Sequence, residues 1–187
     1  RETLGGIHKN YNVYPDIAVY GKALGNGYPI NAIVGKDEIM KSARKSFMSS
    51  TFWSERIGFV AALATIKQME KIKSWRQTKK IGKEIKVYWK KIFNKYKIEA
   101  DIIGLDSIPS FIFKENNVIR KTFITKELLN KGILAGNSFY VSTAHKKNIM
   151  KVYFKEFEKV IAKLKKDKNI EENLEGYKSE NTFKRLN

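Results

Sequence analysis

The fold is decided by the stretch Pro15-Asp16-Ile17-Ala18-Val19-Tyr20-Gly21-Lys22-Ala23-Leu24-Gly25-Asn26-Gly27-Tyr28-Pro29, in which one lysine stands between an apolar run and a glycine-rich loop. The run from Ile17 to Tyr20 predicts a strand that ends just before Lys22. The glycines that follow leave room for a flat, bulky group beside the lysine. A lysine that is both buried and accessible is typical of an amine that attacks a carbonyl carbon, because burial favours its neutral form.

Length and composition exclude several classes of protein. The chain has 187 residues, of which 42% are hydrophobic, enough for one ordinary domain or two small lobes. The absence of cysteine excludes disulfides, thiolate catalysis and zinc–thiolate sites. The two histidines, His8 and His145, are too far apart to predict a metal cluster. The longest apolar run, Ile57 to Ile66, is about half of a bilayer span, and no signal peptide is recognised, so we expect a cytoplasmic protein.

A net charge of +18 makes a basic nucleic-acid-binding module an alternative function. Only six of the 37 basic residues are arginine, whereas recognition of phosphates and bases favours the arginine fork. We therefore expect a lysine-rich surface, with neither nucleic acid nor a membrane as partner, although the charge suits anionic metabolites. Nucleic-acid binding that weakens steeply with added salt would distinguish the alternative.

Residues 1–75 predict short strands, loops and two helix starts. A second strand is expected within Ile30–Gly35, and Asp37 is expected to cap a helix that ends at Arg44 or Lys45. Ser54 and Glu55 predict the next helix start, with the carboxylate near the positive end of the helix dipole. The apolar residues that follow, 57–66, leave no polar face, so this helix is predicted to be buried. A lobe boundary is expected near residue 75, within a long helical connection.

Residues 76–165 predict a second lobe that mixes helices and strands, and 166–187 a polar tail. Apolar residues at helical spacing predict two amphipathic helices. Their stripes are Ile81, Ile85, Tyr88, Trp89, Ile92 and Tyr96 in the first helix, and Ile149, Tyr153, Phe157, Val160, Ile161 and Leu164 in the second. Strands are predicted after Pro109 and at 138–142, and between them Thr125 is expected to cap a helix over 126–131 that stops at Gly132.

Three motifs together resemble one enzyme family. Pro15-Asp16-Ile17 followed by Gly21-Lys22-Ala23-Leu24-Gly25-Asn26-Gly27-Tyr28-Pro29 resembles the cofactor-lysine signature of class III pyridoxal-phosphate aminotransferases, and is most similar to the branch that includes glutamate-1-semialdehyde aminomutase. Ser50-Thr51-Phe52-Trp53-Ser54-Glu55-Arg56-Ile57-Gly58 resembles the phosphate loop of that family. Leu134-Ala135-Gly136-Asn137-Ser138-Phe139-Tyr140-Val141-Ser142-Thr143-Ala144-His145 resembles its small-domain strand. The resemblance extends from residue 1 to about residue 164.

This resemblance implies a fold and several roles. The implied fold is α/β, the C-terminal part of a fold-type I PLP-dependent transferase, with 1–75 in the large PLP-binding domain and 76–165 forming a small α+β C-terminal domain. Lys22 matches the lysine that forms a Schiff base with pyridoxal 5'-phosphate and shuttles the proton of the substrate α-carbon. Thr51 matches the threonine that reaches the cofactor phosphate of the neighbouring subunit in a homodimer.

The sequence also departs from the family pattern. Many members have Gly-Asn-Pro where this chain has Ser54-Glu55-Arg56. Arg56 is a candidate for binding a substrate carboxylate, although it can equally pair with Glu55. Asn26 is expected to shape its loop, and His145 is expected to be a structural residue at a helix entry.

Several activities remain open. A class III aminotransferase would move an amino group from a small-molecule donor to a carbonyl acceptor, with the substrate unknown. The alternative, a glutamate-1-semialdehyde 2,1-aminomutase, would move the amino group between adjacent carbons of one substrate and would need no external donor. The Trp53-Ser54-Glu55-Arg56 variant favours the aminotransferase. A further alternative is an inactive remnant, in which the helix over 57–66 would expose apolar surface.

We predict that the purified 187-residue chain does not complete transamination by itself. The resemblance places the aspartate that pairs with the pyridine nitrogen ahead of Arg1, so the chain is expected to carry only the lysine half of an active site. The pyridinium must stay protonated for the ring to accept electrons. Amino transfer between a donor and an acceptor is the measurement, and turnover at a normal enzyme rate would contradict the expectation.

Overall fold

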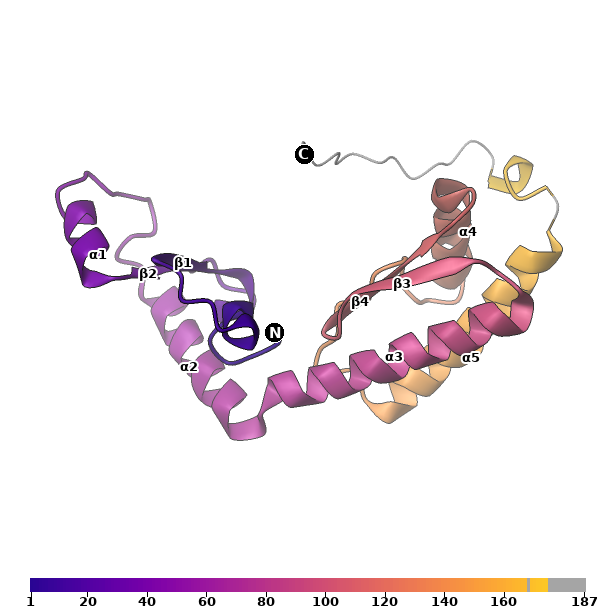
Figure 1. Cartoon of the computed structure of the whole chain (residues 1–187), viewed down its shortest axis with the longest axis horizontal. Coiled ribbons are helices and arrows are strands. Elements are labelled where there is room, and N and C mark those ends of the chain that lie inside the picture. Colours follow the sequence, from indigo (N-terminus) through magenta and orange to yellow (C-terminus); the bar gives the residue numbers. More distant parts are fainter. Residues whose placement is uncertain (168, 175–187) are drawn as a thin grey trace. The chain divides into compact units, whose positions relative to one another are not determined.

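The described residues, 1–167 and 169–174, belong to two units, Arg1–Arg76 and a second unit that begins at Gln77, shown in the computed structural model of Figure 1. In chain order the strands and α-helices are β1 (Ile17–Tyr20), β2 (Ala32–Gly35), α1 (Asp37–Ala43), α2 (Arg56–Ile72), α3 (Ser74–Tyr96), β3 (Ala100–Leu105), β4 (Ile108–Phe113), α4 (Asn117–Leu129) and α5 (Lys147–Lys166). Three short 3-10 helices are η1 (Ile7–Tyr11), η2 (Lys22–Leu24) and η3 (Glu172–Leu174). Across this part of the chain, no helix combines the length and the apolar character that a bilayer crossing requires.

The first unit is built on an antiparallel pair of strands. β1 pairs with β2, with Ile17 opposite Gly35 and Tyr20 opposite Ala32, which confirms both predicted strands. The expected helix follows, but Asp37 is not its cap. Lys36 holds the capping position, and Asp37 is the first helical residue. Its carboxylate lies 2.7 Å from the Lys41 ammonium one turn further on. The negative charge of Asp37 is also stabilised by the positive, N-terminal end of the helix dipole.

α2 does not show the burial that its apolar sequence predicts. Gly58 is its only buried residue, and both Val60 and Leu63 are 59% exposed. The physical reason is that the described part of the first unit supplies a two-stranded sheet and short helices, which are too small to surround a 17-residue helix. The exposed apolar side chains on it are Ile57, Phe59, Val60, Leu63 and Ile66.

The second unit is organised around α3 and α5, and both predicted helices are confirmed. The helical connection expected near residue 75 is interrupted at Lys73, which has a φ of 52° and separates α2 from α3. Figure 1 shows α3 and α5 side by side along the β3–β4 hairpin, and aromatic contacts such as Tyr88–Phe154 join the two helices. The one error in the predicted stripes is Ile149, which is exposed, because Met150 takes the inward position.

The strands of this unit differ from the prediction in two ways. β3 was not expected, yet it pairs with β4 along its whole length, from Ala100 opposite Phe113 to Leu105 opposite Ile108. β4 begins at Ile108, so Pro109 lies inside the strand and not before it. Pro109 is tolerated there because its backbone faces away from β3 and its carbonyl oxygen accepts the N–H of Phe139 at 2.9 Å.

The strand predicted at 138–142 is present only as an extended segment along β4. The N–H of Phe111 donates to the carbonyl of Asn137 at 2.9 Å, and the N–H of Val141 donates to Ser107 at 3.2 Å. Of the contacts between this segment and β4, one has the geometry of sheet pairing, an isolated antiparallel bridge between Ser110 and Ser138. The alternation of a buried Val141 with an exposed Tyr140 nevertheless follows the predicted period.

The helix before that segment starts earlier than predicted. α4 begins at Asn117, so Thr125 lies in its interior, where its hydroxyl donates to the carbonyl of Lys121 at 3.0 Å. Thr125 is therefore not a cap. Gly132 follows the helix with a φ of 72°, a conformation in which glycine is favoured, and its N–H donates to Leu129.

Part of the predicted polar tail is ordered against the core. η3 ends at Leu174, whose side chain is only 1% exposed, so the prediction of a loose tail is wrong for 172–174. Leu174 joins the aromatic and aliphatic cluster of the second unit. The rest of that prediction, over 175–187, lies outside the described residues.

A buried polar pair lies in this cluster. The indole N–H of Trp89 in α3 donates to the Tyr153 hydroxyl in α5 at 2.9 Å. Trp89 is 0% and Tyr153 4% exposed. Burial raises the pKa of the Tyr153 hydroxyl well above its usual range, so the neutral form is favoured in the folded chain.

We predict that Tyr153→Phe lowers the free energy of unfolding by about 1–3 kcal/mol at pH 7, because it leaves the indole N–H buried without an acceptor. Urea denaturation measures the loss, with Tyr14→Phe, at an 85% exposed side chain, as control. The unfolded tyrosine ionises near its ordinary pKa of about 10 while the folded one stays neutral, so wild-type stability falls above that pH and the difference from the variant narrows. Equal stability of variant and wild type at pH 7 would contradict the role of the hydrogen bond.

Candidate active site

Lys22 lies at the end of β1, as predicted. Gly21 continues the extended backbone, and Lys22 then turns into η2 with a φ of 49°. The left-handed conformation is unfavourable for a residue with a Cβ, by about 1–3 kcal/mol, and such residues concentrate at functional sites. The turn is closed by the N–H of Asn26, which donates to the carbonyl of Lys22 at 3.1 Å. Asn26 and Gly27 also have positive φ, which fits the expected role of Asn26 in shaping the loop.

The prediction that Lys22 is buried is wrong, as far as the described part of the chain shows. Its side chain is exposed, and it forms no hydrogen bond or ion pair with the part of the chain that the structure describes. By contrast, Lys36, which lies between β2 and α1, pairs with Asp16 at 2.6 Å. Burial of an amine requires a second segment over it, and none of the described segments covers this one.

The lysine loop packs against the start of α2 through two glycines. A Cβ built on Gly25 would lie 2.1 Å from the carbonyl oxygen of Tyr28 and 2.7 Å from the side chain of Ile30. A Cβ built on Gly58 in α2 would lie 3.1 Å from Ile30. Ile30 therefore fills the space between loop and helix. Ile30 was predicted only as the start of a strand, and Gly58 only as the last residue of the stretch that resembles the phosphate loop. The contact between them was not predicted.

Thr51 and Arg56 lie on the segment that leads into α2. Thr51 is exposed in a turn, and α2 begins only at Arg56, so Thr51 is not a helix cap. The cap is Glu55, whose carboxylate accepts the N–H of Ile57 at 2.9 Å and of Gly58 at 3.2 Å. Glu55 was expected near the helix start, but Ser54 has no capping contact. Two donors of this helix N-terminus are thus used within the chain.

Arg56 is the first residue of α2 and is exposed. Since the Glu55 carboxylate bonds to backbone N–H groups, the structure gives no pairing of Glu55 with Arg56 among the described residues. The structure brings the start of α2, and with it Arg56, to the lysine loop through the contact of Ile30 with Gly58. Thr51 precedes this contact and is joined to it only along the chain.

His145 has a structural position. The N–H of Ser142 donates to its Nδ1 at 2.9 Å, and the ring packs edge-on against Phe139. α5 begins two residues later, at Lys147. This position fits the expected role of His145 at a helix entry.

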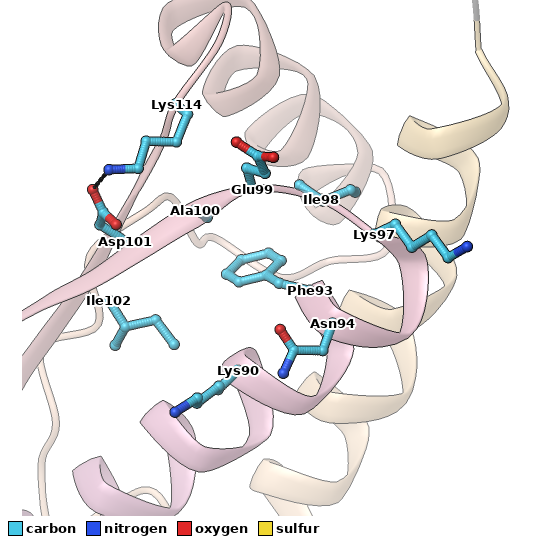
Figure 2. Close-up of a pocket in the computed structure, with 10 residues that line it drawn as sticks. All are labelled: Lys90, Phe93, Asn94, Lys97, Ile98, Glu99, Ala100, Asp101, Ile102 and Lys114. Atoms are coloured by element: carbon cyan, nitrogen blue, oxygen red, sulfur yellow. Dashed lines mark hydrogen bonds and ion pairs between the residues drawn. The ribbon is translucent and has the colours of Figure 1, made fainter.

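The structure also has a cavity that none of these residues lines. It has a volume of about 700 Å³ and lies between α3 and β3 in the second unit (Figure 2). Neither Lys22, Thr51 nor Arg56 lines it. Among the described residues, no group of three or more histidine, aspartate or glutamate side chains is placed to hold a metal ion.

The chain is similar to known proteins over most of its length. The aminotransferase class-III family model matches residues 6–141. The glutamate-1-semialdehyde 2,1-aminomutase of Methanosphaera stadtmanae is 29% identical over 184 residues, which cover 89% of this chain and 43% of that protein. The 3-aminobutyryl-CoA aminotransferase of Cloacimonas acidaminovorans is 35% identical over 117 residues, or 62% of this chain and 28% of the relative. The chain thus spans less than half the length of these curated relatives.

Solved structures show the same fold. The internal aldimine form of the FumI protein of Sphingopyxis sp. MTA144 superposes with a TM-score of 0.81 and 18% identity, over 87% of this chain and 40% of that one. An omega-transaminase of Sphaerobacter thermophilus superposes with a TM-score of 0.77 and 15% identity, over 86% and 41%. The fold is the α/β C-terminal part of a fold-type I PLP-dependent transferase, and the chain belongs to the class-III aminotransferase family.

Proposed function

We propose that this chain contributes the lysine side of an active site for pyridoxal-phosphate-dependent amino-group transfer, with Lys22 as the residue that binds the cofactor covalently. The observation that carries the proposal is the exposed Lys22 amine, which is unpaired among the described residues and is held in a left-handed turn at a strand end by the packing of its loop on α2. Family membership supports the same assignment. The cytoplasmic location expected from the sequence stays a prediction.

The residues present fit pyridoxal 5'-phosphate at the lysine end of the molecule. The Lys22 amine is accessible to an aldehyde, and Gly25 and Gly27 in the loop beside it have no side chains. When bound, the cofactor supplies a ring that accepts electron density from the substrate α-carbon. Lys22 would hold the cofactor through its amine nitrogen, and the same amine would carry the proton from the substrate α-carbon to the carbon of the cofactor aldehyde.

The other candidate residues take supporting roles in this proposal. Thr51 supplies a hydroxyl to the cofactor phosphate of a neighbouring subunit in a homodimer, and Arg56 supplies a guanidinium to a substrate carboxylate. The exposure of both side chains supports binding of a group from outside the chain. We also propose that residues 1–75 are part of the large domain and that 76–165 form the small one, with the division of the chain after Arg76 in support.

The reaction class has one alternative with specific support. The M. stadtmanae relative is an aminomutase and the C. acidaminovorans relative an aminotransferase. We favour transfer between two small molecules, an amino donor and a carbonyl acceptor. The reason is the Ser54-Glu55-Arg56 variant, in which Arg56 offers a charged contact to a substrate in addition to the amine of Lys22. Dependence of the rate on an external amino donor separates the two reactions.

We predict that pyridoxal 5'-phosphate followed by borohydride labels Lys22 in preference to the other lysines. Peptide mapping by mass spectrometry locates the adduct, and Lys22→Arg removes it while keeping the charge. Lys36→Arg is the matched control, since Lys36 lies just after β2 and is paired with Asp16. Uniform labelling of surface lysines, or an undiminished adduct yield in the Lys22 variant, would refute the role of this amine.

A second prediction concerns the loop. Gly25→Ala places a methyl group against the carbonyl oxygen of Tyr28, and overpacking of this kind costs about 1–3 kcal/mol. The loop should move off α2, and the yield of the Lys22 adduct should fall. Gly136→Ala is the control, because its Cβ would meet nothing closer than 3.7 Å. An adduct yield in Gly25→Ala equal to that of the control would show that the packing does not position Lys22.

A further inference from the structure

β3 is the outer strand of its sheet. β4 lies on one side of it, and the extended segment 137–141 occupies the far side of β4. Within the described ranges, no strand pairs with the other side of β3. Such an edge presents backbone donors and acceptors to any extended peptide.

The register identifies which backbone groups face outward. The N–H of Lys114 donates to the carbonyl of Glu99 at 3.1 Å, so Glu99 bonds toward the partner strand. Backbone groups alternate along an antiparallel strand, so Asp101 and Ile103 also face β4, whereas Ala100, Ile102 and Gly104 face outward. The carbonyl of Gly104 already accepts the Lys86 ammonium at 2.8 Å. Ala100 and Ile102 therefore offer the free edge of the strand.

A groove runs along this edge. It is the cavity of about 700 Å³ between α3 and β3, and Figure 2 shows the ring of Phe93 between α3 and the strand, with Lys90 and Asn94 on α3 beside it. Phe93 and Ile98 form an apolar base, and both are buried. Lys90 and Lys97 are exposed at its rim. A peptide that adds to a sheet as a strand needs an open strand edge for its backbone hydrogen bonds and a neighbouring surface, here α3, that every second side chain can contact.

We propose that this groove binds an extended acidic segment of a partner protein, which adds to β3 as a further strand. The charge of the rim selects the occupant. Three lysines, Lys90, Lys97 and Lys114, line the groove against two carboxylates, Glu99 and Asp101. Lys114 is paired with Asp101, whereas Lys90 and Lys97 have no ion pair among the described residues. A second copy of this chain would bring another net charge of +18 to the same surface, so self-association through this edge is disfavoured.

The alternation of a strand defines the sequence that fits. Residues of the added strand that face α3 meet Lys90 and Lys97, so carboxylates suit these positions. The residues between them lie on the other face, beside Ile103 and beside Asp101, whose carboxylate is already paired with Lys114. Neutral β-branched residues suit that face. The expected ligand therefore alternates glutamate with valine or threonine.

The probe is the synthetic peptide acetyl-Thr-Glu-Val-Glu-Val-Glu-Thr-amide, added to the whole chain. Amide exchange at Ala100 and Ile102, followed by NMR, should slow by about tenfold or more on binding, because their N–H groups become hydrogen-bonded. The amides of Asp101 and Ile103 should change little, since they are already bonded to β4. A peptide of the same charge with proline in place of both valines is the control ligand.

Two variants test the geometry. Lys90→Glu should weaken binding about fivefold, through the loss of one exposed ion pair and its replacement by repulsion. Lys80→Glu changes the net charge equally on an exposed part of α3 outside the groove, and should change the affinity far less. Ala100→Pro should weaken binding about fivefold by removing one outward donor, while the ladder with β4 keeps its bonds.

The outcomes separate this site from the one proposed at Lys22. Slowed exchange at Ala100 and Ile102 with the expected order of variants supports the groove, whatever the result of cofactor labelling. Absence of binding at millimolar peptide overturns the proposal. Equal weakening by Lys80→Glu and Lys90→Glu, or full binding of the proline peptide, also overturns it, since the chain would then attract polyanions in general.

Discussion

The contact of Ile30 with two glycines is the constraint on which the candidate site depends. Gly25 in the lysine loop and Gly58 in the first turn of α2 lack side chains, so loop and helix can approach until Ile30 fills the space between them. The loop is then closed by backbone hydrogen bonds, of which the bond from Asn26 to Lys22 fixes the left-handed turn. The position of the reactive amine is thus set by packing and backbone geometry, because its own side chain contributes no bond within the described residues.

Much of this site could be predicted from local sequence, for a physical reason. An apolar run followed by glycine marks a strand end, and that alone places Lys22. The contact of Ile30 with Gly58 joins residues 28 positions apart, and no periodicity encodes it. The same limit explains the caps: Ser54 and Glu55 both suit a helix start, and only the geometry shows that the Glu55 carboxylate reaches two N–H groups.

In the second unit, periodicity was informative where helices are long and uninformative where elements are irregular. The stripes of α3 and α5 were predicted because one face of each helix is buried along most of its length. β3 was missed because Ala-Asp-Ile-Ile-Gly-Leu does not alternate and contains a glycine, although Gly104 lies within the paired region with a φ of 81°. α4 was misplaced because its first residue follows Asn116 in a left-handed conformation without a side-chain cap.

Burial was the property that sequence predicted least well, and the two units show why. The sequence of an apolar helix shows which side chains are suited to burial, but they are buried only if another part of the protein packs against them. α3 finds one in the rings of Phe111 and Phe157, whereas α2 and Lys22 find none in the described residues of the first unit. The second unit therefore holds the packed core, and the first holds the residues of the proposed chemistry. Since no residue of that chemistry belongs to the aromatic cluster, substitutions at Lys22 or Arg56 should change reactivity without loosening the packing around Trp89.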